Sequence, residues 1–286
     1  MKALVIPLLA AVAEPANIII AKIGLTRVRI SMRDYLPGAF LFLTICSSLS
    51  LIKLGHFSTF HVNHTGIIKL ACIIVIASTW NVLYYKGLSK EKVNTTEGIT
   101  ILMPLATIAI SWLFMPKNFN TQIAITALLA TGIIIWTYRS KQLFRPDRYS
   151  LMLAAALVLI ALEDNLVAQV LTENSISPAL LYTIRVSIIT VIMFTLYRPS
   201  LRKLSFRSVK LLALTGLVGT TTMLLLFYGL RDAGVVATGL IYILVPVFVL
   251  FSARRFLHEH IKPSRIVAMT VVCALILFAT YLNYLR

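Results

Sequence analysis

Apolar residues in this chain gather into long runs that are separated by short polar connections. A helix needs about 20 consecutive apolar residues to cross the hydrocarbon core of a bilayer. The pattern predicts an all-α integral membrane protein with ten transmembrane helices, and no connection is long enough to form a soluble domain. The predicted spans are residues 4–23, 36–54, 67–88, 93–115, 121–138, 151–171, 178–197, 209–230, 235–256 and 266–285.

Composition and charge support a chain embedded in lipid. Of the 286 residues, 59% are hydrophobic and 13% are charged, whereas a soluble domain carries about 25% charged residues. The net charge of +17 comes from Lys and Arg in the short loops, where basic residues set the orientation of the spans and contact anionic lipid headgroups. We therefore expect membrane lipid around the chain and no nucleic-acid partner.

The distribution of basic residues predicts how the chain is oriented. The loops after spans 1, 3, 5, 7 and 9 hold 19 Lys and Arg residues, against 6 on the opposite side. Basic loops lie in the cytoplasm by the positive-inside rule. The chain is therefore expected to be a multi-pass protein of the cell (cytoplasmic) membrane with both termini outside.

The chain contains an internal repeat with a shift of 142 residues. Because five spans per half is an odd number, the halves must lie upside-down relative to each other, as in many secondary transporters. We expect one membrane domain built from two five-span repeats, residues 1–140 and 149–286. The matching pairs are Gly87-Leu88 with Gly229-Leu230, Val93 with Val235, Thr96 with Thr238, Ile99 with Ile241, and Pro104 with Pro246.

The repeat resembles that of the drug/metabolite transporter (DMT) superfamily, in its ten-span EamA-like branch. The first half departs from the pattern, because Met115-Pro116-Lys117 stands where the family often has a glutamate. The first span also resembles the first helix of the small multidrug resistance branch, in which a membrane glutamate binds either a proton or a cationic substrate. The residues that carry the two resemblances are Ser177-Pro178, Arg185, Tyr228-Gly229-Leu230, Pro246 and Glu259 for the first, and Ala13-Glu14 with Lys22 for the second.

The resemblance implies a secondary transporter with alternating access between the repeats and a small-molecule substrate. It also implies cytoplasmic termini, which are common in relatives, whereas the charge count places the termini outside. No nucleophile–base pair or phosphate-binding loop occurs in the sequence, so we expect neither an enzyme nor a cofactor. The histidines His56, His61 and His64 share one short loop without an acid or thiol, and we expect no metal there. The expected oligomeric state is a monomer or a homodimer.

Ionisable residues inside a membrane cost about 2.5–3.5 kcal/mol at a helix centre on insertion scales, so they are candidates for function. Glu14 lies near the middle of the first span, next to Pro15 and one turn before Asn17. We interpret it as a titratable site for a proton or a cation. The alternative is a neutral, hydrogen-bonded glutamate. Pro15, Pro104 and Pro246 are expected to break their helices.

Glu163, Asp164 and Asn165 occupy the middle of the sixth span, and we expect them, like Glu14 and Asn17, to bind substrate or proton. Arg185 lies at a similar depth in the seventh span. We expect Arg185 to pair with one of the two carboxylates. The other carboxylate would then face the cavity, and the sequence leaves open which one does. Lys86 and Glu97, at one end of a hairpin, are expected to form a structural ion pair or to reach the headgroups.

Several aromatic residues fall at positions that line the cavity in relatives, where ring faces suit an organic cation. The alternative for each is an interfacial belt or helix packing. These residues are Trp80, Tyr84, Tyr85, Phe227, Tyr228 and Tyr242.

The excess of acid over base in the central spans favours one function above two others. The leading hypothesis is an exporter or proton antiporter of a cationic or zwitterionic solute such as an amine, an amino acid or a drug-like metabolite. The first alternative is an exchanger of anionic phosphate esters or nucleotide sugars, which needs bases that face the cavity. The second is a non-transporting or lipid-handling membrane protein, which needs a dry interface between the halves.

Overall fold

The computed structural model describes residues 2–54, 63–91, 103–114, 147–174 and 176–256, with single residues or pairs between 96 and 133 and between 267 and 275. Over this part the chain is helical, and seven helices are long and apolar enough to cross a membrane. The expected all-α membrane fold is confirmed. The seven correspond to predicted spans 1, 2, 3, 6, 7, 8 and 9. The predicted spans 93–115, 121–138 and 266–285 lie partly or largely outside the described residues, and so does the count of ten.

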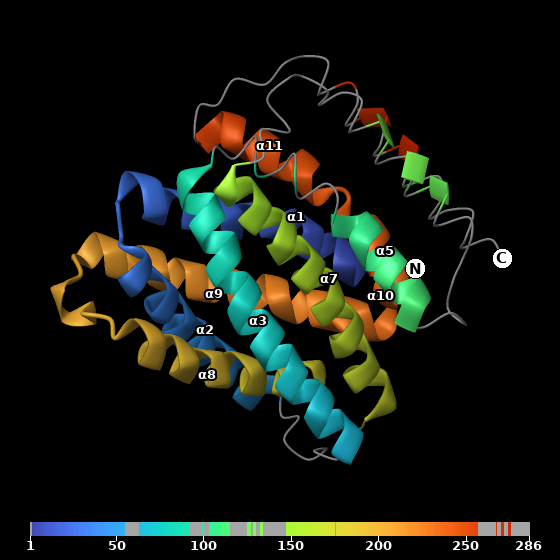
Figure 1. The fold of residues 1–286 in the computed structure, drawn as a ribbon, viewed down its shortest axis with the longest axis horizontal. Helices are drawn as coiled ribbons and strands as arrows, with labels where there is room; N and C mark the ends of the chain where they lie inside the picture. The colour runs from blue at the N-terminus through green and yellow to red at the C-terminus, as the bar shows by residue number, and fades with distance from the viewer. Residues whose placement is uncertain are drawn as a thin grey trace.

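Most of the long helices extend slightly beyond the apolar runs, because their end turns are polar. Figure 1 shows their arrangement. The elements are α1 (Lys2–Lys22), a π-helical turn η1 (Ile23–Arg27), α2 (Met32–Leu54), α3 (His64–Lys90), α5 (Met103–Phe114), α7 (Arg148–Glu173), α8 (Pro178–Tyr197), a 3-10 turn η3 (Leu201–Lys203), α9 (Phe206–Asp232), α10 (Val235–Tyr242) and α11 (Val245–Phe256).

The long helices after residue 147 start at side-chain caps. Asp147 accepts hydrogen bonds from the backbone N–H groups of Tyr149 and Ser150, and Ser177 and Ser205 cap α8 and α9 in the same way. The hydrogen bond from the Ser150 backbone N–H is the main reason why the pKa of Asp147 lies below its usual value. These caps satisfy N–H groups that a helix leaves unpaired in its first turn, and they explain why the three helices begin at these residues.

Packing partners are exchanged between the two halves of the chain. Helix α1 packs along α9 and α11, α3 packs along α7, and α2 packs against α8 and α9. The short helix α5 lies on α7 and α10. Figure 1 shows α3 beside α7 and α2 beside α8. The first and third helices of each half thus contact the third and first helices of the other.

Glycine allows α9 to approach α2 closely. A Cβ atom at Gly216 would lie 2.5 Å from Phe42 Cβ and 2.7 Å from the Phe42 carbonyl carbon. One turn on, a Cβ atom at Gly219 would lie 2.9 Å from a methyl group of Leu43. Small residues at such positions let two membrane helices pack backbone to backbone.

The three prolines behave differently from one another. The expected break at Pro15 is wrong, because α1 runs without interruption from Lys2 to Lys22. A proline removes one backbone hydrogen bond, and the packing of α1 along α9 and α11 holds the helix on both sides of that gap. The break near Pro246 is present, since α10 ends at Tyr242 and α11 starts at Val245. Pro104 is the second described residue of α5, and residues 100–102 before it lie outside the described part, so the break expected there stays a prediction.

Lys22 joins the end of α1 to the end of α3. Its side chain is 8% exposed, and its ammonium donates hydrogen bonds to the carbonyl oxygens of Leu88, at 2.6 Å, and of Glu91. A cation is favoured at the carboxyl end of a helix because the last carbonyls are unpaired. Burial raises the pKa of Glu91, which follows the last residue of α3.

Candidate functional site

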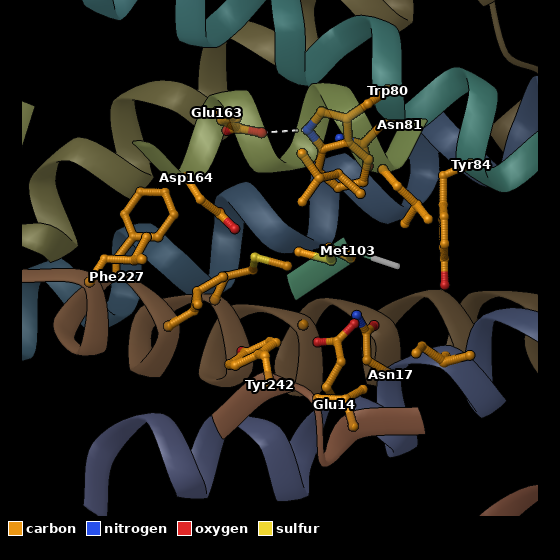
Figure 2. A pocket seen from close by; sticks show the side chains of 18 of the residues that line it. Glu14, Asn17, Trp80, Asn81, Tyr84, Met103, Glu163, Asp164, Phe227 and Tyr242 are labelled. Carbon is orange, nitrogen blue, oxygen red and sulfur yellow. Dashed lines mark hydrogen bonds between the residues drawn. The ribbon is translucent and has the colours of Figure 1, made fainter. Parts of the chain in front are cut away.

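A cavity of about 140 Å³ lies among α1, α2, α3, α5, α7, α8, α9, α10 and α11. A single buried water needs a cavity of about 10–15 Å³, so this cavity has room for a small solute. Figure 2 shows the side chains that face it. The residues singled out from the sequence that line this cavity are Glu14, Asn17, Trp80, Tyr84, Tyr85, Glu163, Asp164, Arg185, Tyr242 and Pro246.

Glu163 is held by two donors on the cavity wall. Its Oε1 accepts a hydrogen bond from Arg185 Nε at 2.5 Å, and its Oε2 accepts one from Trp80 Nε1. Glu163 is 3% exposed and Arg185 4% exposed. The guanidinium of Arg185 also lies 5.9 Å from the centre of the Phe227 ring. A buried ion pair with these extra contacts neutralises both charges, so Glu163 is the partner of Arg185 that the sequence left undecided.

Asp164 is the next residue of α7 and points into the cavity (Figure 2). Successive residues of an α-helix are separated by about 100° around its axis. Glu163 can therefore bond to α8 and α3 while Asp164, which is 8% exposed, faces the open space. With Glu163 neutralised by Arg185, the carboxyl of Asp164 adds an acid to the wall formed by α7.

Glu14 and Asn17 face the cavity from α1, and Tyr242 does so from α10 (Figure 2). The side chains of Glu14 and Asn17 interact with each other. Glu14 Oε2, Asn17 Oδ1 and the Tyr242 hydroxyl are buried and have no hydrogen-bond partner within the described part of the chain. Buried polar atoms are nearly always hydrogen-bonded in folded proteins. This end of the cavity therefore offers unsatisfied polar atoms to a bound molecule.

Aromatic rings connect the cavity to the packed core. Tyr84 lies edge-on to both Trp80 and Tyr85, with ring centres 6.3 and 5.5 Å apart. Tyr85 in turn lies 5.5 Å from Tyr35. Such edge contacts fix the rings, so Tyr84 and Tyr85 form a rigid apolar wall.

The sequence from residue 148 to residue 281 matches the model of the EamA-like transporter family. This part of the chain belongs to the EamA-like transporter family. The match confirms the resemblance to the DMT superfamily over these residues, and it supports a membrane transporter of this type. Because the match begins at residue 148, it leaves the likeness of the first span to the small multidrug resistance branch as a prediction.

A solved structure extends the fold similarity to nearly the whole chain. It is titled only as the crystal structure of a protein, it covers 98% of this chain and 96% of its own, and it has a TM-score of 0.68 at 13% identity. At this identity the likeness shows the fold alone. No curated protein matches the chain.

Two residues predicted for the site lie elsewhere. Asn165 is buried behind the cavity wall, where its side-chain amide donates to the carbonyl oxygens of Ala161 and Thr107. It links α7 to α5, because the rotation of α7 turns it away from the cavity. Tyr228 lies outside the cavity and packs under the guanidinium of Arg231, 4.9 Å from its ring centre. Its neighbour on α9, Phe227, takes the cavity-facing position.

Other predictions fall on residues that the structure does not describe. Lys86 is exposed, but its expected partner Glu97 lies outside the described residues, so their ion pair stays a prediction. Among the three histidines considered as a metal site, His56 and His61 also lie outside the described part.

Several residues that line the cavity were missed by sequence reasoning. Thr238 is 1% exposed and its hydroxyl has no hydrogen-bond partner among the described residues. The internal repeat pairs it with Thr96, and that pairing was the available signal. Tyr182, Thr107 and Gly219 line the cavity as well, but ordinary apolar runs surround them and nothing in the sequence distinguishes them.

Proposed function

We propose that this protein is a secondary transporter that exchanges a small cationic or zwitterionic organic solute for protons across the cytoplasmic membrane. One observation carries the proposal. Glu14, Glu163 and Asp164 line the cavity, and the only Lys or Arg among its described lining residues, Arg185, is bound to Glu163. Two acids are left without a basic partner. Carboxyl groups at such depth are energetically costly, and those that a membrane protein keeps usually mark a substrate or proton pathway.

The mechanism follows from competition for the two remaining acids. Glu14 and Asp164 each bind either a proton or a positively charged group of the solute, because both states neutralise a carboxylate in a poorly hydrated space. A solute that enters from one side releases protons to that side. When the halves rock about the cavity, the site opens to the other side and protons displace the solute. The exchange of packing partners between halves supports this motion of one repeat against the other.

Exchange of anions is the weaker alternative, because it needs basic groups free to face the cavity. Arg185 is bound to Glu163, and Lys22 is bound to the carbonyl oxygens at the end of α3. Lys86 is exposed and does not line the cavity. A role in lipid handling is also less well supported, since carboxyl groups and the Asn17 amide lie within the otherwise largely apolar lining of the space between the halves.

The test is proton release from purified protein as amines and amino acids are titrated in. We expect proton release for wild type and its loss in Glu14→Gln. A matched control is Glu173→Gln, because Glu173 pairs with Lys69 at the far end of α7, outside the cavity. Stabilisation by phosphorylated or sugar-linked anions, without proton release by any cation, would instead support anion exchange.

A further inference from the structure

The Glu14 end of the cavity contains three polar oxygen atoms that can accept hydrogen bonds and have no partner among the described residues. This cluster consists of Glu14 Oε2, Asn17 Oδ1 and the Tyr242 hydroxyl, all of them buried. Asn17 is 9% exposed. A carboxylate oxygen and an amide oxygen accept only, and a hydroxyl oxygen accepts as well as donates.

The three residues lie close together. Asn17 follows Glu14 by one turn of α1, and their side chains interact. Tyr242 lies within electrostatic reach of Glu14 and also of Asp164 across the cavity. Figure 2 shows Glu14, Asn17 and Tyr242 on the same side, with Asp164 opposite. The free atoms thus border one part of the cavity.

Gly219 of α9 borders this part of the cavity and leaves it narrow but open. A Cβ atom at Gly219 would lie 3.4 Å from Asn17 Oδ1. Glycine therefore leaves the space over the amide oxygen that any larger residue would reduce. A compact donor group fits there better than a bulky one.

We propose that this cluster binds a primary ammonium group of the solute, an inference that rests on the proposed function. The three N–H bonds of a primary ammonium match the three acceptors, one each to Glu14 Oε2, Asn17 Oδ1 and the Tyr242 oxygen. A quaternary ammonium has the same charge but no N–H bond, so it leaves Asn17 and Tyr242 unsatisfied. The site therefore selects primary amines over quaternary ones.

The rings on the cavity wall do not provide an alternative cage. Quaternary cations are bound by ring faces arranged around them. Here Trp80 is engaged with Glu163, and Tyr84 and Tyr85 lie edge-on to one another. Selectivity consequently comes from the polar atoms at Glu14.

The experiment compares hexylammonium with hexyltrimethylammonium by calorimetric titration of the purified full chain in detergent. These probes share charge and alkyl chain and differ in N–H donors. Wild type should bind hexylammonium at least about tenfold more tightly. Asn17→Leu and Tyr242→Phe should each reduce that ratio by about three- to tenfold, as expected for loss of one hydrogen bond, and leave hexyltrimethylammonium binding unchanged. Tyr228→Phe, which removes a hydroxyl outside the cavity, should keep the wild-type ratio.

The outcomes separate this inference from the proposed function. Equal wild-type affinities for the two probes, both lost in Glu14→Gln, would overturn the ammonium cluster and leave cation binding at Glu14 intact. A wild-type preference that persists in both Asn17→Leu and Tyr242→Phe would show that size alone discriminates, which also overturns it. Binding of neither probe would contradict the proposed function itself. The wild-type comparison needs no variant, so poor folding of a variant does not block the test.

Discussion

At the scale of single residues, two neighbouring acids on one helix have different environments. Glu163 is bound by Arg185 and Trp80, whereas Asp164 points into the cavity. Removing one partner of a buried ion pair leaves an uncompensated charge, which costs about 3–5 kcal/mol. Removing an acid from the cavity wall strands no partner.

We therefore expect Glu163→Gln to lower the free energy of unfolding by about 3–5 kcal/mol, and Asp164→Asn to leave it nearly unchanged while impairing proton exchange. Thermal unfolding in detergent and proton release measure the two effects. The double variant Glu163→Leu/Arg185→Met should recover most of the lost stability, because it removes both charges. A destabilisation as large in Asp164→Asn as in Glu163→Gln would contradict this division of roles.

The sequence predicted the depth of these residues but not their direction. Counting residues from the span ends placed Arg185 level with both carboxylates. Which carboxylate bonds to Arg185 depends on how α7 is rotated about its axis. Most residues of α7 are apolar, so its sequence has no polar face that would indicate this rotation. The same limit explains why the neighbours Phe227 and Tyr228 were both expected at the cavity, although Phe227 lines it and Tyr228 does not.

At the scale of helices, local sequence signals predict where a helix begins better than they predict its contacts with other helices. Ser177 and Pro178 fix the start of α8, and the predicted and observed ranges of that helix agree. The break expected at Pro15 failed because tertiary packing keeps α1 helical, and packing partners cannot be read from hydropathy. Contacts between helices give two further predictions.

The bond of Lys22 to the end of α3 should stabilise the protein. Lys22→Met keeps the length of the side chain and removes the hydrogen bonds to Leu88 and Glu91. A hydrogen bond to a charged group contributes about 1.5–3 kcal/mol, and we expect a loss in this range in the free energy of unfolding. Lys90→Met is the matched control, since Lys90 is exposed near the same end of α3. Equal melting temperatures for the two variants would argue against the bond.

The close contact of α9 with α2 should not tolerate a methyl group. Gly216→Ala places a Cβ atom against the backbone of Phe42, which cannot move aside as a side chain can. Overpacking of this kind costs about 1–3 kcal/mol. At Gly132 no atom of the described residues lies within 4 Å of an added Cβ atom, so Gly132→Ala should leave the melting temperature unchanged or raise it. A melting temperature for Gly216→Ala that equals wild type would mean that α9 and α2 are further apart.

At the scale of the whole molecule, the internal repeat and the exchange of packing partners both support two inverted halves. The repeat was visible in the sequence because glycine, threonine and proline recur at one fixed shift. The cavity between the halves was not visible, since its described lining comes from nine helices spread along the sequence.

Charge predicts which side each loop faces. We expect a cysteine introduced at Arg207, in the first turn of α9, to be labelled only from the cytoplasm, and one at Thr65, in the first turn of α3, only from outside. Both positions are exposed. The measurement uses an impermeant maleimide on intact cells, in a background in which Cys46, Cys72 and Cys273 are replaced by serine. Labelling of the Arg207 position from outside would reverse the predicted orientation.

The most direct test of the account is transport by the purified protein in lipid vesicles. With a primary amine outside and an acidic interior, wild type should accumulate the amine and release protons from the vesicles. Glu14→Gln and Asp164→Asn should each abolish this exchange, while Glu173→Gln should exchange as wild type does. Amine uptake that is independent of the proton gradient, and equal in wild type and Glu14→Gln, would contradict proton exchange at this cavity.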